Sequence, residues 1–178
     1  MMMIYLSVIE TDEDRNKFKE IYEEYRQSLY LEALSIVKNP EDAEDIVEDT
    51  FLKVADNFTE ISQKKRQKMR AYIVIINRNN AIDRYNKNKK DLEKKDDTPL
   101  EEIVDTGYFD SFEYDDLYAA IKKLPQKYKD IIYLYDLLDI GTKATAKILK
   151  ISVDTVYKRV SRARTLLKRL LEKGDKYE

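Results

Sequence analysis

The most informative segment of the chain is residues 142–170, TKATAKILKISVDTVYKRVSRARTLLKRL. Its pattern predicts a short helix, a three-residue turn and a longer basic helix, which is the order of a helix-turn-helix. The apolar stripe of the longer helix is formed by Val156, Val160, Ala163, Leu167 and Leu170. The opposite face is basic and polar, as a helix that enters the major groove of DNA requires.

The first turns of this basic helix would carry the contacts to duplex DNA. The residues that we expect at base edges or flanking them are Asp154, Thr155, Tyr157, Lys158, Arg159 and Arg162. Arg164 and the basic residues after it would reach only phosphate or solvent. The alternative for this segment is a solvated amphipathic helix with no DNA partner.

Composition excludes several classes of protein. The 178 residues include no Cys and no His, so a disulfide framework, a thiol nucleophile, an imidazole base and a Cys/His zinc site are all excluded. Three glycines are too few for the turns of an all-β fold. No apolar run reaches the ~20 residues of a bilayer span, and the first residues lack the basic start of a secretory signal. We therefore expect a cytoplasmic all-α protein with no cofactor and no membrane partner.

The net charge of −2 is the sum of large opposing terms. Residues 1–60 carry −10 and residues 61–95 carry +9, while residues 96–120 carry −9 and residues 121–178 carry +8. A near-neutral chain therefore contains two basic segments, which are the electrostatic signature of a polyanion partner. Solvated helix faces are the alternative interpretation.

The first basic segment contains residues 69–90, MRAYIVIINRNNAIDRYNKNKK. Its period predicts a helix that is apolar at first and becomes basic toward its end. Aromatic residues interleaved with cations are typical of sites that hold unpaired bases, although a Tyr at helical spacing is more often part of a core. The candidate residues for single-stranded DNA are Tyr72, Arg78, Asn79, Asn80, Asp83, Arg84 and Lys87.

An acidic helix is predicted over residues 39–54, NPEDAEDIVEDTFLKV. Asn39 is the expected cap and Pro40 the first helical residue. Four carboxylates, Glu41, Glu44, Asp45 and Glu48, recur at three- and four-residue spacing, so they could hold Mg²⁺ in an all-α nucleotide pyrophosphatase or form an acidic docking face. The enzyme needs a second carboxylate pair on a facing helix, and the next helix offers only Asp83. We therefore prefer docking.

Helical periods also set the domain organisation. A long helix ends before Asn39, the acidic helix has a buried stripe that reaches Phe58, and a polar stretch over residues 59–68 precedes the third helix. Four short helices follow near the C-terminal end, with boundaries at Pro125, Gly141 and Ser152. We expect an N-terminal three- to four-helix bundle over residues 1–90, a flexible acidic linker over residues 91–111, and a four-helix domain with the helix-turn-helix over residues 112–178.

Three strings in register resemble bacterial extracytoplasmic-function (ECF) sigma factors, the two-domain minimal RNA polymerase sigma subunits. These strings are DAEDIVEDTFLKV at residues 42–54, INRNNAIDRY at residues 76–85, and LPQKYKDIIYLYDL followed by TVYKRVSRARTLL at residues 124–137 and 155–167. The resemblance implies a protein that is no enzyme and that directs core RNA polymerase to a subset of promoters. A helix-turn-helix regulator that acts without polymerase stays open as an alternative, as does the pyrophosphatase.

The resemblance also implies a role for each segment. The acidic helix would bind the beta-prime clamp helices of core polymerase, and its docking residues would be Asp42, Glu44, Asp45, Glu48 and Phe51. The third helix would hold the melted promoter element, with Tyr72 where the family often has Trp. The helix-turn-helix would read the upstream duplex element beside the beta flap, and an anti-sigma factor is a possible further partner.

Several positions depart from the family pattern, among them Ala144-Thr145-Ala146, which stand where Glu-Ile-Ala is usual before the turn. Glu48 stands where Gln is usual, so the clamp contact would differ in detail. Lys150 stands where the family has a turn glycine. Because a residue other than glycine is disfavoured at positive φ, we expect a slightly altered turn or a marginal C-terminal domain.

Overall fold

The computed structural model describes residues 1–91 and 116–174, and this part of the chain contains helices and turns but no strand. Clustering of contacts divides the chain into two compact units, Met1–Thr106 and Gly107–Glu178. The expected all-α, two-domain fold is confirmed. The predicted linker lies outside the described residues, apart from Asp91 at the end of a helix.

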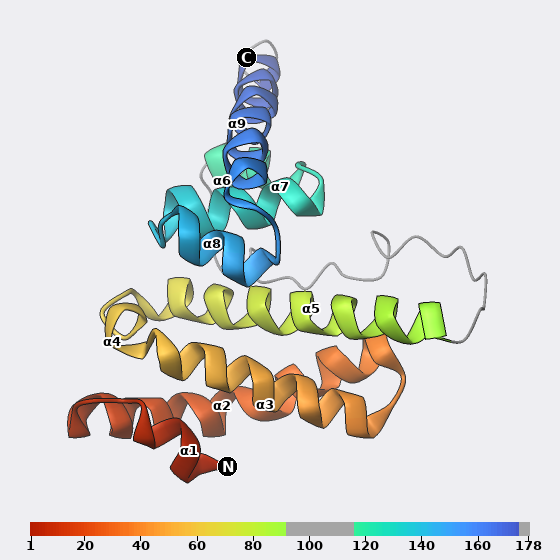
Figure 1. Ribbon diagram of the computed structural model, residues 1–178. Coiled ribbons are helices and arrows are strands. Elements are labelled where there is room, and N and C mark those ends of the chain that lie inside the picture. Colours follow the sequence, from red (N-terminus) through yellow and green to blue (C-terminus); the bar gives the residue numbers. More distant parts are fainter. Residues whose placement is uncertain (92–115, 175–178) are drawn as a thin grey trace. The chain divides into compact units, whose positions relative to one another are not determined.

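Unit 1 is built on three long helices (Figure 1). Its helices are α1 (Met2–Ser7), α2 (Asp12–Val37), α3 (Pro40–Asp56), α4 (Phe58–Ile61) and α5 (Arg66–Asp91). α2, α3 and α5 pack against one another in pairs, which buries the apolar stripe of each. The predicted start of α3 is confirmed, because the Asn39 side chain accepts a hydrogen bond of 2.9 Å from the Asp42 N–H and Pro40 is the first helical residue.

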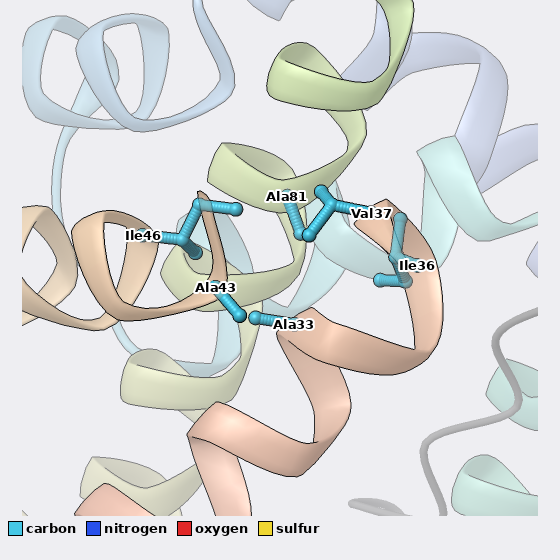
Figure 2. Close-up of a cluster of buried hydrophobic side chains, with 6 residues drawn as sticks. All are labelled: Ala33, Ile36, Val37, Ala43, Ile46 and Ala81. Atoms are coloured by element: carbon cyan, nitrogen blue, oxygen red, sulfur yellow. The ribbon is translucent and has the colours of Figure 1, made fainter. Parts of the chain in front are cut away.

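Small side chains let the three long helices approach closely at one end of the bundle. Figure 2 shows Ala33 of α2, Ala43 of α3 and Ala81 of α5 within one buried cluster. Ile36, Val37 and Ile46 fill the remaining space. Helix axes can come together only where side chains are small, so these alanines set the spacing of the bundle.

Aromatic side chains fill the opposite part of unit 1. Phe18 lies 6.0 Å from Phe51 and 5.2 Å from Phe58 between ring centroids, and Tyr5 of α1 joins the same cluster. Phe58 is buried, but α3 ends at Asp56 and Phe58 begins α4. The predicted polar stretch over residues 59–68 is therefore too long at both ends, because residues 59–61 belong to α4 and residues 66–68 belong to α5. Ile61 is buried in α4, and α5 already begins at Arg66.

Unit 2 has the four predicted helical segments. They are α6 (Asp116–Lys122), α7 (Gln126–Ile131) continued by the π-helical segment η2 (Ile132–Leu137), α8 (Thr142–Leu149) and α9 (Val153–Gly174). The wider π turn lets four consecutive residues, Ile131 to Leu134, face the core. The stripe of α9 is buried at Val156, Val160 and Ala163, as predicted.

The turn between α8 and α9 forms without glycine. Lys150 adopts the left-handed conformation with φ 51° and ψ 45°, and its N–H bonds to the carbonyl of Ala146. Ser152 then caps α9, because its hydroxyl accepts a hydrogen bond of 3.1 Å from the Thr155 N–H. Lys150 thus keeps the left-handed conformation that a turn glycine would adopt, at the energetic cost that this conformation has for a residue with a side chain.

Candidate polymerase and DNA interfaces

The acidic residues of α3 lie on two different sides of the helix. Asp42 faces α5, where it forms an ion pair with Arg84 and accepts a hydrogen bond of 2.7 Å from Asn88. Asp45 lies on the same side, with its carboxylate 3.5 Å from the Arg84 guanidinium and its side chain 60% exposed. Glu44 and Glu48 face α2 instead, because they are half a turn away from Asp42.

Glu44 and Glu48 line one wall of an open hollow of about 310 Å³ between α2 and α3. The other wall is formed by Tyr22, Arg26 and Tyr30 of α2, with the Arg26 guanidinium 5.8 Å from the centre of the Tyr22 ring. The hollow thus combines two carboxylates with aromatic surface. Such a surface suits a partner that presents both basic and apolar groups.

Phe51 is not available for docking. It is fully buried, with its ring centroid 4.7 Å from that of Tyr22. A large apolar side chain on the inner side of an amphipathic helix is most stable in the core, so Phe51 supports the docking helix from within. The prediction of a direct contact through Phe51 is corrected accordingly.

The described residues contain no group of three or more acidic side chains arranged to hold a metal ion. Of the four residues proposed for a pyrophosphatase, Asp45 lies 3.5 Å from the Arg84 guanidinium, whereas Glu44 and Glu48 line the hollow toward α2. The geometry that the hydrolase alternative requires is therefore not assembled in this part of the chain.

A polar seam joins α5 to α3 and α2 inside unit 1. The Asn77 amide donates to the carbonyl of Leu29 at 3.0 Å and to the Glu32 carboxylate at 2.9 Å. The Thr50 hydroxyl donates to the carbonyl of Ile46 at 2.7 Å, lies 3.3 Å from the Asn77 side-chain oxygen and accepts from the Asn80 amide at 3.1 Å. All of these groups are buried or partly buried, so the seam fixes the rotation of α5 against its neighbours.

Glu32 is the titratable group of this seam. Burial raises the pKa of Glu32 to about 7, while the hydrogen bond from Asn77 and the positive charge of Arg78 act in the opposite direction. Its second carboxylate oxygen is buried and accepts no hydrogen bond. Desolvation therefore dominates, and the carboxyl holds its proton at a higher pH than an exposed glutamate does.

The seam changes the predicted set of residues for single-stranded DNA. Tyr72 and Arg78 are fully buried and Asn80 is 6% exposed, so these three do not face solvent in this structure. Burial also raises the pKa of Tyr72 above its ordinary value. The predicted contacts through Tyr72, Arg78 and Asn80 are therefore corrected to structural roles. The residues of the set that stay at the surface, in whole or in part, are Asn79, Asp83, Arg84 and Lys87.

In unit 2, α9 presents the expected face at the surface. Asp154, Lys158 and Arg162 are exposed, and Tyr157 is 55% exposed. Thr155 and Arg159 are partly buried. The Thr155 hydroxyl lies 2.8 Å from that of Ser152 in the helix cap, so it has a structural partner already. The buried stripe and the exposed basic face lie on opposite sides of α9, as the sequence predicts.

Arg164 has a different role from the one predicted. Its guanidinium donates to both oxygens of the Asp136 carboxylate in η2, with the Nε contact at 3.1 Å. The same guanidinium lies 5.8 Å from the centre of the Tyr135 ring. Because a bidentate pair holds the side chain in one place, Arg164 joins α9 to η2.

Comparison with known proteins identifies the family. Residues 21–91 match the family Sigma-70 region 2, and residues 114–167 match the family Sigma-70, region 4. The RNA polymerase sigma factor SigV of Bacillus subtilis (strain 168) is 32% identical over 152 residues, which cover 85% of this chain and 89% of SigV. The chain belongs to the ECF sigma factors. The ECF sigma factor SigM of the same strain is 27% identical over 158 residues, which cover 87% of this chain and 95% of SigM.

Solved structures of sigma factors are also similar to this chain. The sigma factor RpoE, in its co-crystal structure with the anti-sigma factor NepR from Bartonella quintana, is 24% identical with a TM-score of 0.41. The alignment covers 88% of this chain and 97% of RpoE. CnrH, solved in complex with the cytosolic domain of CnrY, is 19% identical with a TM-score of 0.39 and aligns over 97% of each chain.

Membership of the family establishes the general activity of this sigma factor. Sigma factors bind core RNA polymerase and promoter DNA and direct the initiation of transcription, and the polymerase carries out the chemical reaction. The pyrophosphatase and the polymerase-independent regulator are not favoured by these matches. None of the described helices has the length and apolarity of a bilayer span.

The burial of the polar seam in this sigma factor was not predicted from the sequence. Thr50 and Asn77 are polar residues and were not assigned to the core, although both are fully buried. One signal was present, because Asn77, Asn80, Arg84 and Asn88 recur at spacings of three and four residues along α5. A polar stripe with that spacing indicates a helix face that packs against another polar surface.

Proposed function

We propose that this ECF sigma factor docks core RNA polymerase on the acidic side of α3 and contacts promoter DNA with one face in each unit. Glu44, Asp45 and Glu48 would meet the clamp helices of the polymerase, with Asp42 acting through Arg84. The exposed face of α5, at Asn79, Asp83 and Lys87, would lie along the melted element. The face of α9 around Lys158 and Arg162 would read the upstream duplex element.

The observation that supports this proposal best is the geometry of α8 and α9. A strained but complete turn connects the two helices, and α9 buries its aliphatic stripe while Asp154, Lys158 and Arg162 stay exposed. An exposed basic face on a fixed recognition helix is what major-groove entry requires. The order of the two matched regions supports our proposal that unit 1 contacts the melted element.

The proposal also covers the setting in which the chain works. It would act in the cytoplasm, where polymerase and promoter DNA are found. An anti-sigma factor that covers the basic faces between signals would be a further partner, because exposed cationic faces otherwise bind nucleic acid without sequence preference.

The test is reconstitution with core RNA polymerase. The purified chain should co-elute with core polymerase and start transcripts from promoters selected out of genomic fragments by the reconstituted enzyme. The triple variant Glu44→Gln, Asp45→Asn, Glu48→Gln should weaken co-elution, because it removes three charges that face the partner.

The matched control is Glu20→Gln with Glu23→Gln, which removes exposed charges from α2. It should leave co-elution unchanged. If the wild-type chain binds promoter duplex but never joins the polymerase, the polymerase-independent regulator replaces this proposal.

A further inference from the structure

The first helix, α1, is held firmly against unit 1. The Tyr5 side chain is fully buried, and its ring centroid lies 5.9 Å from that of Tyr22 and 6.2 Å from that of Phe51. The Arg15 Nε donates to the carbonyls of Leu6 at 3.2 Å and of Ile9 at 3.0 Å. Two anchors, one aromatic and one through hydrogen bonds, therefore fix both the position and the end of α1.

The outward side of α1 is apolar and open to solvent. Met3 is 86% exposed, Ile4 is 53% exposed and Val8 is 49% exposed. In the described part of the chain, the other large hydrophobic residues that are exposed to a similar degree are Met1, Leu31, Val153 and Tyr157. Exposed apolar side chains are thus concentrated on this short segment, and such a concentration is typical of a binding surface.

The helix that carries this apolar surface packs against α3. Tyr22, which contacts the ring of Tyr5, also lines the hollow that contains Glu44 and Glu48. The Tyr5 hydroxyl is also affected by acidic residues of α3. Burial is the main cause that raises the pKa of Tyr5 to about 12, and the charges of Glu48 and Asp49 contribute. The apolar side of α1 and the carboxylates of α3 therefore flank the same aromatic side chains.

We propose that Met3 and Ile4 of α1, together with Val8 at its C-terminal cap, form an apolar extension of the α3 docking face and bind the same segment of core RNA polymerase. This inference rests on the proposed function, because it takes the occupant of the α3 face to be the polymerase. We choose the polymerase as the occupant because Tyr22 contacts α1 and also lines the hollow that contains Glu44 and Glu48. A carboxylate surface beside an apolar one fits a partner segment that presents basic and apolar side chains together.

The two parts of this surface have different tasks. Carboxylates steer a basic partner over a distance and make its binding sensitive to salt, whereas aliphatic side chains contribute once water is excluded. Replacement of the apolar residues should therefore weaken binding at every salt concentration by a similar factor. Replacement of the carboxylates should weaken binding mainly at low salt.

The experiment measures the affinity of the full chain for purified core RNA polymerase, by anisotropy of a dye-labelled chain, from low to high KCl. The variant is Met3→Gln, Ile4→Gln, Val8→Ser, which keeps all anchoring residues. We expect at least about tenfold weaker binding with an unchanged salt dependence. The comparison variant Glu44→Gln, Asp45→Asn, Glu48→Gln should reduce the salt dependence.

Controls separate this inference from the proposed function. Leu31→Gln removes an equally exposed apolar side chain, nine residues further along α2 than Tyr22, and should bind as the wild type does. An equal loss in Leu31→Gln, or wild-type affinity in the α1 variant, overturns the inference while the proposed function stands. Failure of the wild-type chain to bind overturns both.

A second copy of the chain is the competing occupant. Sedimentation of the wild type and of the α1 variant, each without polymerase, tests it. Monomers in both cases agree with our proposal. A wild-type dimer that the α1 variant disrupts, together with unchanged polymerase binding, assigns the apolar side of α1 to self-association and overturns it.

Discussion

Single residues of this sigma factor show how burial changes chemistry. Glu32 lies on α2 and would be an ordinary surface acid by its residue type, yet its carboxyl is enclosed beside Asn77 and Arg78. The folded chain therefore binds a proton at Glu32 more tightly than the unfolded chain does. Stability and pH are coupled through this one group.

The sign of that coupling follows from the raised pKa. The folded-state pKa of Glu32 is about 7 and the ordinary value is 4.5. Below 4.5 both states hold the proton, and between the two values only the folded state does. The contribution of Glu32 to the free energy of unfolding is therefore largest below pH 4.5. It decreases by up to about 3 kcal/mol as the pH rises to 7.

Glu32→Gln should abolish this part of the pH dependence. The amide oxygen of glutamine can still accept the hydrogen bond from Asn77, and glutamine carries no proton to lose. Urea unfolding at a series of pH values between 4.5 and 8 measures the effect as a difference from the wild type. Glu23→Gln, at an exposed site on α2, should follow the wild-type curve. Parallel curves for wild type and Glu32→Gln would contradict the assignment.

Lys150 is the second informative residue. A left-handed residue other than glycine costs ~1–2 kcal/mol, and glycine loses ~0.5–1 kcal/mol more chain entropy on folding. Lys150→Gly should therefore raise the free energy of unfolding of unit 2 by roughly 0.5–1 kcal/mol. Thermal unfolding checks this value.

Lys147→Gly is the matched control for Lys150→Gly, because it places glycine in the regular part of α8 at an exposed site. It should lower stability by about 1 kcal/mol. If Lys150→Gly also lowers the free energy of unfolding, the left-handed conformation of Lys150 is not strained.

At the scale of elements, the polar seam determines how α5 packs on α3 and α2. Thr50 contacts both Asn77 and Asn80, so a rotation of α5 would separate several buried groups from their partners at once. An unpaired buried polar group costs about 1–3 kcal/mol. The seam thus selects one arrangement of the three helices among those that their apolar stripes would allow.

A double-mutant cycle of Thr50→Val and Asn77→Ala tests the seam. Each single variant should destabilise unit 1 by about 1–3 kcal/mol, and the pair should be coupled by at least ~0.5 kcal/mol because the two buried polar side chains are in contact at 3.3 Å. Denaturant titration of the four proteins gives the coupling energy.

Asn79→Ala serves as the control for this cycle. The Asn79 amide bonds to the carbonyl of Ile75 one turn earlier on the same helix, so its loss should change stability by less than about 0.5 kcal/mol. Additive effects of Thr50→Val and Asn77→Ala would mean that the seam is not a connected unit.

The contrast between α1 and α9 explains how much of the structure the sequence could predict. In α9 the apolar residues follow a helical period, so the helix, its cap and its two faces were all foreseeable. The first eight residues are almost uniformly apolar, and no period distinguishes the buried Tyr5 from the exposed Met3. Tertiary contacts with Phe18 and Tyr22 decide which side is buried, and these are not local in sequence.

The candidate sites show the same limit. The charge of α3 was predictable, but the division of its carboxylates between α2 and α5 depends on how three helices pack. The sequence favours DNA contacts for Arg78 and Asn80, because a cation can neutralise phosphate and an amide can bond a base edge. Their burial follows from the rotation of α5, which is set by partners that lie 27 to 48 residues away in the chain.

At the scale of the whole molecule, the chain combines two basic segments with a net charge of −2. A base contact and a phosphate contact from such segments differ in their response to sequence and salt. This difference makes it possible to assign individual arginines of α9 while the chain works within the polymerase complex.

Arg162→Ala should weaken binding of the reconstituted enzyme to its selected promoter by ~1–3 kcal/mol, and random duplex should be bound as before, if Arg162 makes a bidentate base contact. Filter binding on both DNA molecules at several salt concentrations checks this.

Arg169→Ala is the comparison for Arg162→Ala, since Arg169 lies exposed two turns later on α9. It should affect both DNA molecules equally or not at all. An equal loss on both for Arg162→Ala, with a salt slope reduced by about 1, would assign Arg162 to phosphate.

The complete burial of Tyr72 has an optical consequence. The chain contains 14 tyrosines and no tryptophan, so indole fluorescence is absent from it. Tyr72→Trp would place a single indole where an aromatic ring is already enclosed. Its emission, which lies at longer wavelength than that of tyrosine, would report the interior of unit 1 during unfolding of the isolated chain, with no second indole to contribute.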